Sequence, residues 1–245
     1  MKDLHVHTTF CDGKNTPEEM VEAAIEKGLD TLGFSVHSYM DFDLSYCIRK
    51  EKIEDYKKEI NRLKEKYSDK IEILCGVELD YLSVMDTSGF DYKIGSVHYV
   101  KTCDGYEAVD LGEEAFLKIA EKMGGFYEMA ENYYEYVAKL GEIKPDIIGH
   151  FDLITKYNED DRLLDTKNPR YVAAWKKAAD ALIPLNVPFE INTGAISRGV
   201  RKTPYPAPEI IDYLKQNGAK LIMNGDTHAK ENLCYQFDKW EYLLK

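Results

Sequence analysis

Short apolar segments rich in β-branched residues alternate along the chain with longer segments in which apolar residues recur at helical spacing. The short segments predict strands covered on both faces, and the longer ones predict amphipathic helices. The predicted strands are Leu4–His7, Thr31–His37, Ile71–Leu79, Tyr92–Tyr99, Asp146–Phe151, Pro188–Asn192 and Lys220–Asn224. The predicted helices are Pro17–Lys27, Lys50–Tyr67, Glu113–Leu140, Tyr171–Leu182 and Pro208–Gln216.

This alternation of strand and helix predicts a parallel sheet, either open or closed into a barrel. Thr16 and Glu19 have the spacing of a capping box, and Gly28 and Gly218 are typical of helix carboxyl ends. The segment Lys101–Gly112 follows neither pattern. It predicts a long loop beside a strand end, where a barrel would carry a lid.

The composition is that of a globular protein, with 245 residues of which 44% are hydrophobic and 31% charged. No linker marks a boundary, so we expect one domain over residues 1–245. No apolar run reaches the ~18 residues of a membrane span, and no secretion signal opens the chain, which predicts a cytoplasmic protein. The cysteines are scattered without a C-x-x-C pair and predict reduced thiols: Cys11, Cys47, Cys75, Cys103 and Cys234.

The charge balance restricts the partners of the protein. The 32 basic and 44 acidic residues give a net charge of −12, which disfavours the backbone of a nucleic acid as a partner. A small anion remains compatible with this charge, because bound metal ions reverse the local field.

Histidines and carboxylates fall at the ends of the predicted strands. The six histidines are His5, His7, His37, His98, His150 and His228, and Glu78 and Asp226 take similar places. A single histidine in such a place is more often a solvated or hydrogen-bonded side chain than a ligand. In a parallel barrel, however, all carboxyl-terminal strand ends open on one face, so the whole set converges there.

Imidazole and carboxylate ligands without a thiolate cluster suit zinc, manganese or iron(II). A bridging carboxylate holds two ions about 3.5–4 Å apart, a geometry suited to hydrolysis. In the first strand, strict alternation predicts that Asp3, His5 and His7 share one face. We expect Asp3 to orient a histidine and not to bind metal itself.

The order of these residues resembles the PHP (polymerase and histidinol phosphatase) family, in its free-standing histidinol-phosphatase branch. The resemblance rests on "DLHVHTTFCDG", "GVELDY", "GSVHYV", "GHFDLI", "EINTGAISRG" and "NGDTH", in this order along nearly the whole chain. It implies a distorted (β/α)7 TIM-like barrel of a single domain. It also implies a centre of three divalent transition-metal ions, which are zinc, manganese or iron.

Carried over by position, the resemblance implies three sets of ligands. The first ion takes His5, His7, Glu78 and Asp226. Glu78 bridges to the second ion, which takes His98 and His150. The third takes Asp12, His37 and His228, with Cys11 as a competing soft ligand beside Asp12. Many relatives carry an acidic residue where Val36 stands here. Glu78, Asp226 and His228 are the residues expected to carry catalysis.

The loop after the sixth predicted strand holds the candidates for phosphate binding. Arg198 is expected to bind the phosphate, helped by Asn192 and Ser197, with Arg201 and Lys202 as alternatives. Asp80 is expected to meet the ammonium group of histidinol phosphate. Tyr81 is expected to stack on its imidazole, with Tyr99, Tyr106 and Tyr205 as alternatives.

The expected activity is the hydrolysis of L-histidinol phosphate to L-histidinol and phosphate, a step of histidine biosynthesis. The alternative is a related phosphoesterase acting on another small phosphate ester, such as a nucleotide or phosphotyrosine. A nuclease is disfavoured by the charge, and a metal-storage protein by the open, oxygen-rich ligand set. The expected partner is a small-molecule phosphate ester, without nucleic acid or membrane. The protein is expected to be a monomer or small homo-oligomer.

Overall fold

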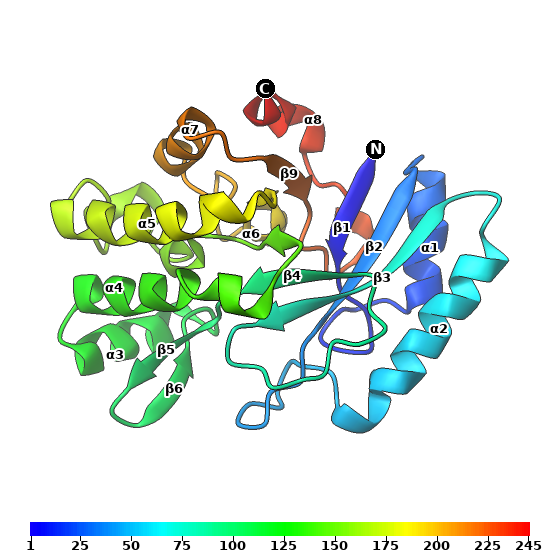
Figure 1. Cartoon of the computed structure of the whole chain (residues 1–245), viewed down its shortest axis with the longest axis horizontal. Coiled ribbons are helices and arrows are strands. Elements are labelled where there is room, and N and C mark those ends of the chain that lie inside the picture. The colour runs from blue at the N-terminus through cyan, green and yellow to red at the C-terminus, as the bar shows by residue number, and fades with distance from the viewer.

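The computed structural model describes residues 1–245 and contains a parallel sheet of seven strands in the order β1-β2-β3-β4-β7-β8-β9 (Figure 1). Each recorded pairing in this sheet is parallel. The strands are β1 Lys2–Val6, β2 Thr31–His37, β3 Glu72–Asp80, β4 Tyr92–Ser96, β7 Ile147–Ile148, β8 Phe189–Asn192 and β9 Leu221–Asn224. The predicted parallel α/β fold is therefore confirmed.

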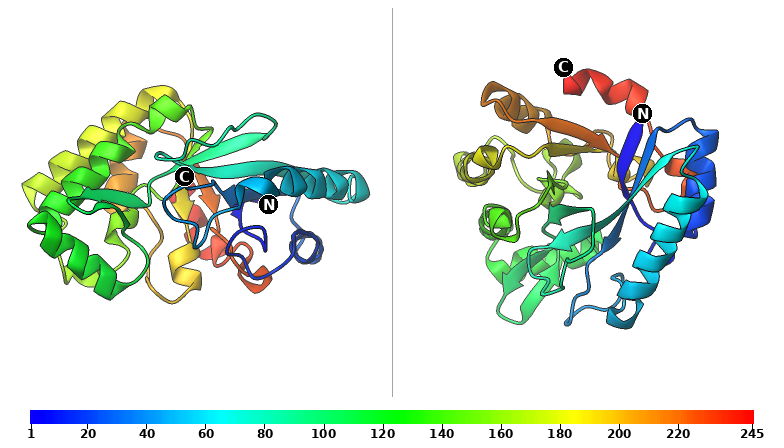
Figure 2. Two further views of the ribbon diagram at one scale, coloured as in Figure 1. Left: turned by 90° about the horizontal axis from the view of Figure 1, so that it is seen from below. Right: turned by 45° about the vertical axis from the view of Figure 1, so that its right-hand side comes forward.

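The sheet curls into a nearly closed barrel, because its two edge strands meet. The amide of His7 donates to the carbonyl of Thr227 at 2.8 Å, and the amide of Thr227 donates to the carbonyl of His5 at 2.8 Å. These bonds join the end of β1 to the segment that follows β9. Both termini consequently lie near each other at one side of the barrel (Figures 1 and 2).

Helices cover the outside of the barrel (Figure 1). They are α1 Pro17–Glu26, α2 Ile53–Lys66, α3 Glu113–Met123, α4 Phe126–Val137, α5 Pro169–Leu182, α6 Gly194–Ser197, α7 Pro208–Gln216 and α8 Phe237–Trp240. Helices α1 and α2 lie against β1–β3, while α3, α4 and α5 gather on the opposite side. None of the helices has the length and apolar character needed to cross a bilayer.

The apolar core lies between the barrel and these helices. Leu32, Phe34 and Val36 of β2 pack with Tyr56 and Ile60 of α2 in one large cluster. Side chains alternate across a strand, so the intervening residues of β2 face the barrel interior. The same alternation in β3 places Val77 and Leu79 in that cluster and leaves Glu78 and Asp80 for the interior.

The first strand departs from strict alternation. The register between β1 and β2 shifts between Asp3 and Val6, as at a β-bulge. Val6 packs in the large outer cluster, whereas Leu4 packs with Tyr92 and Ile94 in a separate small one. The predicted strict alternation, with Asp3, His5 and His7 on one face, is therefore broken at the start of the strand, although His5 and His7 both face Glu78.

Local signals were confirmed at several helix ends. Thr16 and Glu19 form the predicted capping box. Gly28 and Gly218 both have a φ of +74°, which a residue without a Cβ adopts at little cost. The predicted helix Glu113–Leu140 is broken into α3 and α4 at Gly124 and Gly125, whose φ values are +90° and +144°.

A hairpin replaces the long loop predicted for Lys101–Gly112. Strands β5, Tyr99–Thr102, and β6, Gly105–Ala108, pair in antiparallel fashion. The predicted strand Tyr92–Tyr99 divides accordingly, with β4 ending at Ser96 and β5 beginning at Tyr99. Residues of this hairpin border the cavity described next.

Candidate metal centre

The carboxyl-terminal ends of the strands surround a cavity of about 380 Å³. Its lining includes Asp12, His37, His98, His150, Asp226 and His228, which were all predicted to lie near metal. His5, His7 and Glu78 lie beneath it and are fully or almost fully buried. A larger groove of about 810 Å³ at the opposite end of the barrel is lined by Met1, Leu221 and Phe237, among others, and by no histidine.

Glu78 lies at the centre of the cluster and faces imidazoles with both carboxylate oxygens. Its Oε2 atom is 2.9 Å from Nδ1 of His37 and 3.1 Å from Nε2 of His5. Its Oε1 atom is 2.8 Å from Nε2 of His150 and 3.3 Å from Nε2 of His98. Burial opposes the charge of this carboxylate, but the surrounding imidazoles more than offset it and hold the pKa of Glu78 well below its usual range.

His5, His7 and Asp226 form one compact group of donors. Oδ1 of Asp226 is 3.4 Å from Nε2 of His7 and 3.9 Å from Nε2 of His5. Burial, together with nearby His228 and His37, lowers the pKa of His7 to about 3, so this imidazole is neutral at pH 7. Asp226 has a φ of +46°, a strained conformation of the kind found at functional sites.

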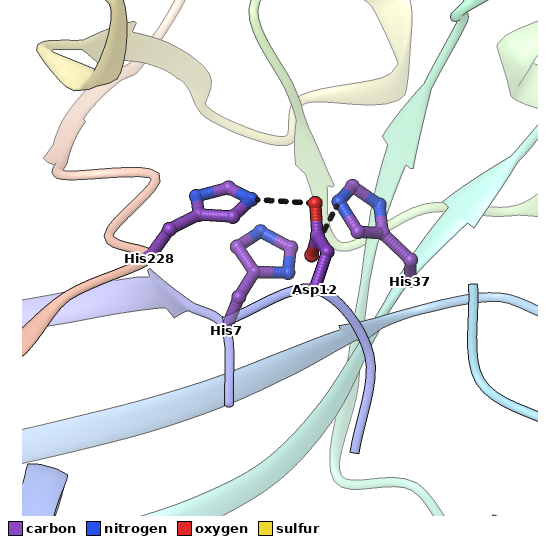
Figure 3. Close-up of side chains that lie close together, drawn as sticks. All are labelled: His7, Asp12, His37 and His228. Atoms are coloured by element: carbon purple, nitrogen blue, oxygen red, sulfur yellow. Dashed lines mark ion pairs between the residues drawn. The ribbon is translucent and has the colours of Figure 1, made fainter. Parts of the chain in front are cut away.

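A second group contains His7, Asp12, His37 and His228 (Figure 3). Asp12 lies between two imidazoles, with Oδ1 3.5 Å from Nε2 of His37 and Oδ2 3.2 Å from Nε2 of His228. The Cys11 thiol instead lies 3.6 Å from Nδ1 of His7, and burial raises the pKa of this thiol to about 12. The geometry thus favours the carboxylate of Asp12 over the thiol as the donor facing this group.

His37, Glu78 and His98 form a third group. His150 also contacts Glu78, so the structure brings together every residue predicted for metal binding. The groups overlap at His7 and His37, whereas the sets implied by the family resemblance share only Glu78.

Unpaired buried atoms provide a test of whether a cation fits this cluster. Nε2 of His5, Nε2 of His7 and Oε2 of Glu78 are buried and close to one another, with Glu78 Oε2 3.1 Å from His5 Nε2, but none of the three makes a hydrogen bond of acceptable geometry. Leaving such atoms unpaired costs about 1–3 kcal/mol each, so they call for a ligand. Imidazole nitrogens and carboxylate oxygens suit zinc, manganese and iron(II), and the residues therefore fit the metals that were expected.

Sequence reasoning missed Glu190, the residue that orients His5. Oε1 of Glu190 lies 2.6 Å from Nδ1 of His5 and accepts a hydrogen bond from the side-chain amide of Asn224 at 2.9 Å. Its Oε2 accepts from the backbone amide of His150 and from the Asn192 side chain. The available signal was a charged residue within an apolar strand, two positions before another polar residue.

Asp3 does not orient a histidine side chain, and that prediction was wrong. Its Oδ1 accepts hydrogen bonds from the backbone amides of His5, at 3.2 Å, and Gly225, at 2.9 Å. Its Oδ2 accepts from the Thr227 hydroxyl at 3.2 Å. Asp3 therefore fixes the backbone at the closure of the barrel. The bulge in β1 explains why this side chain leaves the face of His5.

Asp80 contacts His98 instead of lining the cavity. Its Oδ2 is 3.0 Å from Nδ1 of His98 and accepts from the backbone amide of the same residue at 2.9 Å. Its Oδ1 accepts from the amide of Leu82 at 2.8 Å. With both oxygens engaged, this buried carboxylate orients an imidazole and is not positioned to receive a substrate ammonium group.

Among the residues predicted to bind substrate, Arg198 alone lies in the cavity lining. Its guanidinium group donates to Oδ2 and to the carbonyl of Asp226, both at 3.1 Å, and its side chain is 31% exposed. The other predicted substrate contacts are engaged elsewhere. Asn192 holds Glu190, the Ser197 hydroxyl donates to the Gly194 carbonyl, and the Tyr81 hydroxyl donates to Glu142.

The alternative residues for binding phosphate lie outside the cavity, whereas one alternative for stacking on the imidazole lines it. Arg201 donates to the hydroxyl of Thr155 at 2.6 Å, and Lys202 pairs with Asp160 at 2.8 Å, so neither lines the cavity. Tyr99 does line it, as do Tyr46, Asp110 and Lys156, which were not singled out from the sequence.

Comparisons with known proteins agree with this site. The sequence profile described as "PHP domain" matches residues 3–194. The histidinol-phosphatase of Bacillus subtilis is 25% identical over 97% of this chain and 97% of its own length. A solved structure from Listeria monocytogenes superposes with a TM-score of 0.87 at 22% identity, covering 98% of this chain and 100% of that one.

A second solved structure is that of a complex with ligands. It is the histidinol phosphate phosphatase of Lactococcus lactis in complex with zinc, L-histidinol and phosphate. It superposes with a TM-score of 0.73 at 22% identity, covering 99% of this chain and 92% of that one. At 22% identity these two solved structures bear on the fold alone, and they agree with the parallel barrel described above.

Proposed function

The chain belongs to the PHP domain family, and we propose that it is a metal-dependent histidinol-phosphatase, which hydrolyses L-histidinol phosphate to L-histidinol and phosphate. One observation carries this proposal: a single buried carboxylate, Glu78, faces imidazoles on both of its oxygens at the base of an open cavity. The full-length similarity to a histidinol-phosphatase supports the choice of substrate.

We assign the whole of residues 1–245 to one PHP domain. The profile match ends at residue 194, but Asp226 and His228 follow β9 and belong to the same cluster of donors. The barrel also closes through Thr227. On this assignment the residues beyond 194 belong to the same domain and complete the site.

We further propose three metal positions with the ligand sets expected from the sequence. His5, His7, Glu78 and Asp226 would hold the first ion. Glu78, His98 and His150 would hold the second, and Asp12, His37 and His228 the third. Ions of zinc, manganese or iron in these positions would supply Lewis-acid activation of the phosphoryl group and of a water nucleophile. The overlapping donor groups at His7 and His37 support a multinuclear site, because one tetrahedral ion needs far fewer ligands.

The residues of the chain itself bind and orient the substrate. Arg198 lies over the cluster, fixes the Asp226 carboxylate and presents positive charge to a phosphate group in the cavity. Glu190 and Asp80 hold His5 and His98 in the orientations in which their Nε2 atoms face Glu78.

A panel of phosphate monoesters tests the proposal. Protein reconstituted separately with zinc, manganese and iron(II) should hydrolyse L-histidinol phosphate with a higher kcat/KM than adenosine monophosphate or phosphotyrosine. A clear preference for one of the latter two would establish the alternative, a family phosphoesterase for another small ester. Absence of hydrolysis with every metal and ester would contradict an enzymatic function.

A further inference from the structure

An ion pair on the wall of the cavity has no role in the activity described above. Oδ2 of Asp110 lies 3.2 Å from Nζ of Lys156, which also donates to the Asp110 carbonyl at 3.0 Å. Both residues line the cavity, with side chains 28% and 11% exposed. The other two carboxylates of the lining, Asp12 and Asp226, face imidazoles. Asp110 is thus the one lining carboxylate outside the cluster of histidines.

The backbone holds Asp110 beside the proposed metal ligands. The amide of Val109 donates to the carbonyl of His98 at 2.9 Å, which ties the end of the β5–β6 hairpin to the second residue after β4. The Tyr157 hydroxyl donates to the Asp110 carbonyl at 2.7 Å. These bonds fix the main chain on two sides, whereas the carboxylate has only Lys156 as a side-chain partner.

The carboxylate of Asp110 is charged at neutral pH. Burial raises its pKa, but the positive charge of Lys156, with smaller contributions from His98 and His150, more than offsets this and lowers the pKa of Asp110 below its usual value. The wall therefore presents one anion and one cation side by side. A ligand that itself carries one anion and one cation can replace this pair without leaving an unpaired buried charge.

We propose that Asp110 binds the ammonium group of the substrate and makes the enzyme selective for phosphate esters of vicinal amino alcohols. The inference rests on the proposed function and specifies its substrate class. In such an ester the ammonium nitrogen and the ester oxygen are bonded to adjacent carbon atoms. A phosphate at the cluster therefore places the ammonium group close to it, and Asp110 is held there through His98.

Lys156 then has the complementary role. When the ammonium group pairs with Asp110, the Nζ atom of Lys156 is released from the carboxylate and is free to pair with the phosphate. A nucleotide has no ammonium group to offer Asp110. In phosphotyrosine the ammonium group lies on the far side of the ring from the phosphate. The Asp110 site consequently distinguishes the proposed substrate from both alternatives.

The test compares L-histidinol phosphate with the analogue that lacks only the amine, using metal-loaded protein. In Asp110→Asn the ratio of the two kcat/KM values should fall by about 10- to 100-fold, mostly through KM, because a charged hydrogen-bond partner is lost. Asp110→Glu should retain part of the preference. The matched control is Asp104→Asn on the same hairpin, where Asp104 pairs with Lys122 outside the cavity and the preference should not change.

Equilibrium binding gives a readout that does not depend on turnover. By calorimetry, L-histidinol should bind the wild-type protein more tightly than the amine-free alcohol does, and Asp110→Asn should abolish this difference. Lys156→Met should weaken both phosphate esters alike and leave the preference for the amine in place. Persistence of the preference in Asp110→Asn, or its loss in Lys156→Met alone, would overturn the inference.

Failure of the proposed function gives a different result. A protein that hydrolyses aryl phosphates but not L-histidinol phosphate contradicts the histidinol-phosphatase activity. The Asp110 site is then tested with phosphoethanolamine against ethyl phosphate, a pair that differs only in the ammonium group. Preference for phosphoethanolamine that depends on Asp110 supports the inference, and equal rates contradict it.

Discussion

The Nδ1 atom of His5 lies 2.6 Å from the Oε1 atom of Glu190, and neither side chain is exposed to solvent. Burial alone would favour a neutral carboxyl group, but His5 keeps the pKa of Glu190 below its usual value. The bond turns the other nitrogen of His5 toward Glu78. An acidic partner of this kind also makes an imidazole a stronger metal ligand.

Replacement of Glu190 tests this role. Glu190→Gln should weaken metal binding by about 10- to 100-fold, the usual effect of removing an outer partner of a histidine ligand. Competition with a fluorescent chelator measures the affinity. Glu72→Gln, at the exposed start of β3, serves as the control and should bind metal as the wild type does. Equal affinities of all three proteins would contradict the role of Glu190.

Glu78 and His37 should differ in how much metal their loss removes. Because Glu78 is proposed to bridge two positions, Glu78→Gln should lose metal at both and nearly all activity. His37→Ala should remove mainly one ion. Elemental analysis of carefully purified protein should approach three ions per chain for the wild type. Full metal content and turnover in Glu78→Gln would show that the bridge is wrongly assigned.

Arg198→Ala should reduce kcat/KM on L-histidinol phosphate by about 10- to 150-fold, since a charged contact to phosphate is worth about 1.5–3 kcal/mol. Arg198→Lys should recover only part, because an ammonium group cannot bind two oxygens in a fork. Steady-state kinetics measure both.

Arg201→Ala provides the comparison for Arg198. Arg201 contacts Thr155 and the ring of Tyr205, and none of these three residues lines the cavity. Its loss should therefore lower the melting temperature more than the catalytic efficiency. If Arg201→Ala impaired catalysis and Arg198→Ala left it unchanged, the result would show that Arg201, and not Arg198, binds the phosphate.

Metal loading should release protons at pH 7. The carboxylates around His5 and His98 outweigh the effect of burial and raise the pKa of both imidazoles well above 6.5 in the metal-free protein. Both then carry a proton at pH 7 that a metal must displace. Metal affinity should accordingly rise with pH and fall as the solution is acidified. Calorimetry in buffers of different ionisation enthalpy measures the release, and metal binding without it would contradict these protonation states.

The fold and the cluster of metal-competent residues were the parts most accessible from sequence. The polar residues at strand ends, such as His37 and Asp226, needed only the rule that parallel strands open on one face. The hairpin Tyr99–Ala108 and the break at Gly124 were missed, because short strands and paired glycines leave weak patterns.

Residues around the cluster were less accessible, because their roles depend on which hydrogen-bond donors surround them. The sequence indicates that Asp80 shares a face with Glu78, but not that the amide of Leu82 and the ring of His98 occupy its oxygens. Asn192 was assigned to phosphate for the same reason, although it binds Glu190. Asp110, in a segment predicted as loop, was overlooked because its position depends on a contact to His98 made by its neighbour.

The seam between β1 and the segment after β9 has a consequence for how the protein acquires its site during synthesis. His5 and His7 are synthesised long before Thr227, their backbone partner, and before Asp226, a carboxylate that both imidazoles face. Contacts of such long sequence separation form only after the costly closure of a very long loop. A nascent chain that lacks the segment after β9 therefore exposes two imidazoles without these partners, and His5 and His7 can hold metal together with Asp226 only once that segment has been made and has paired with β1.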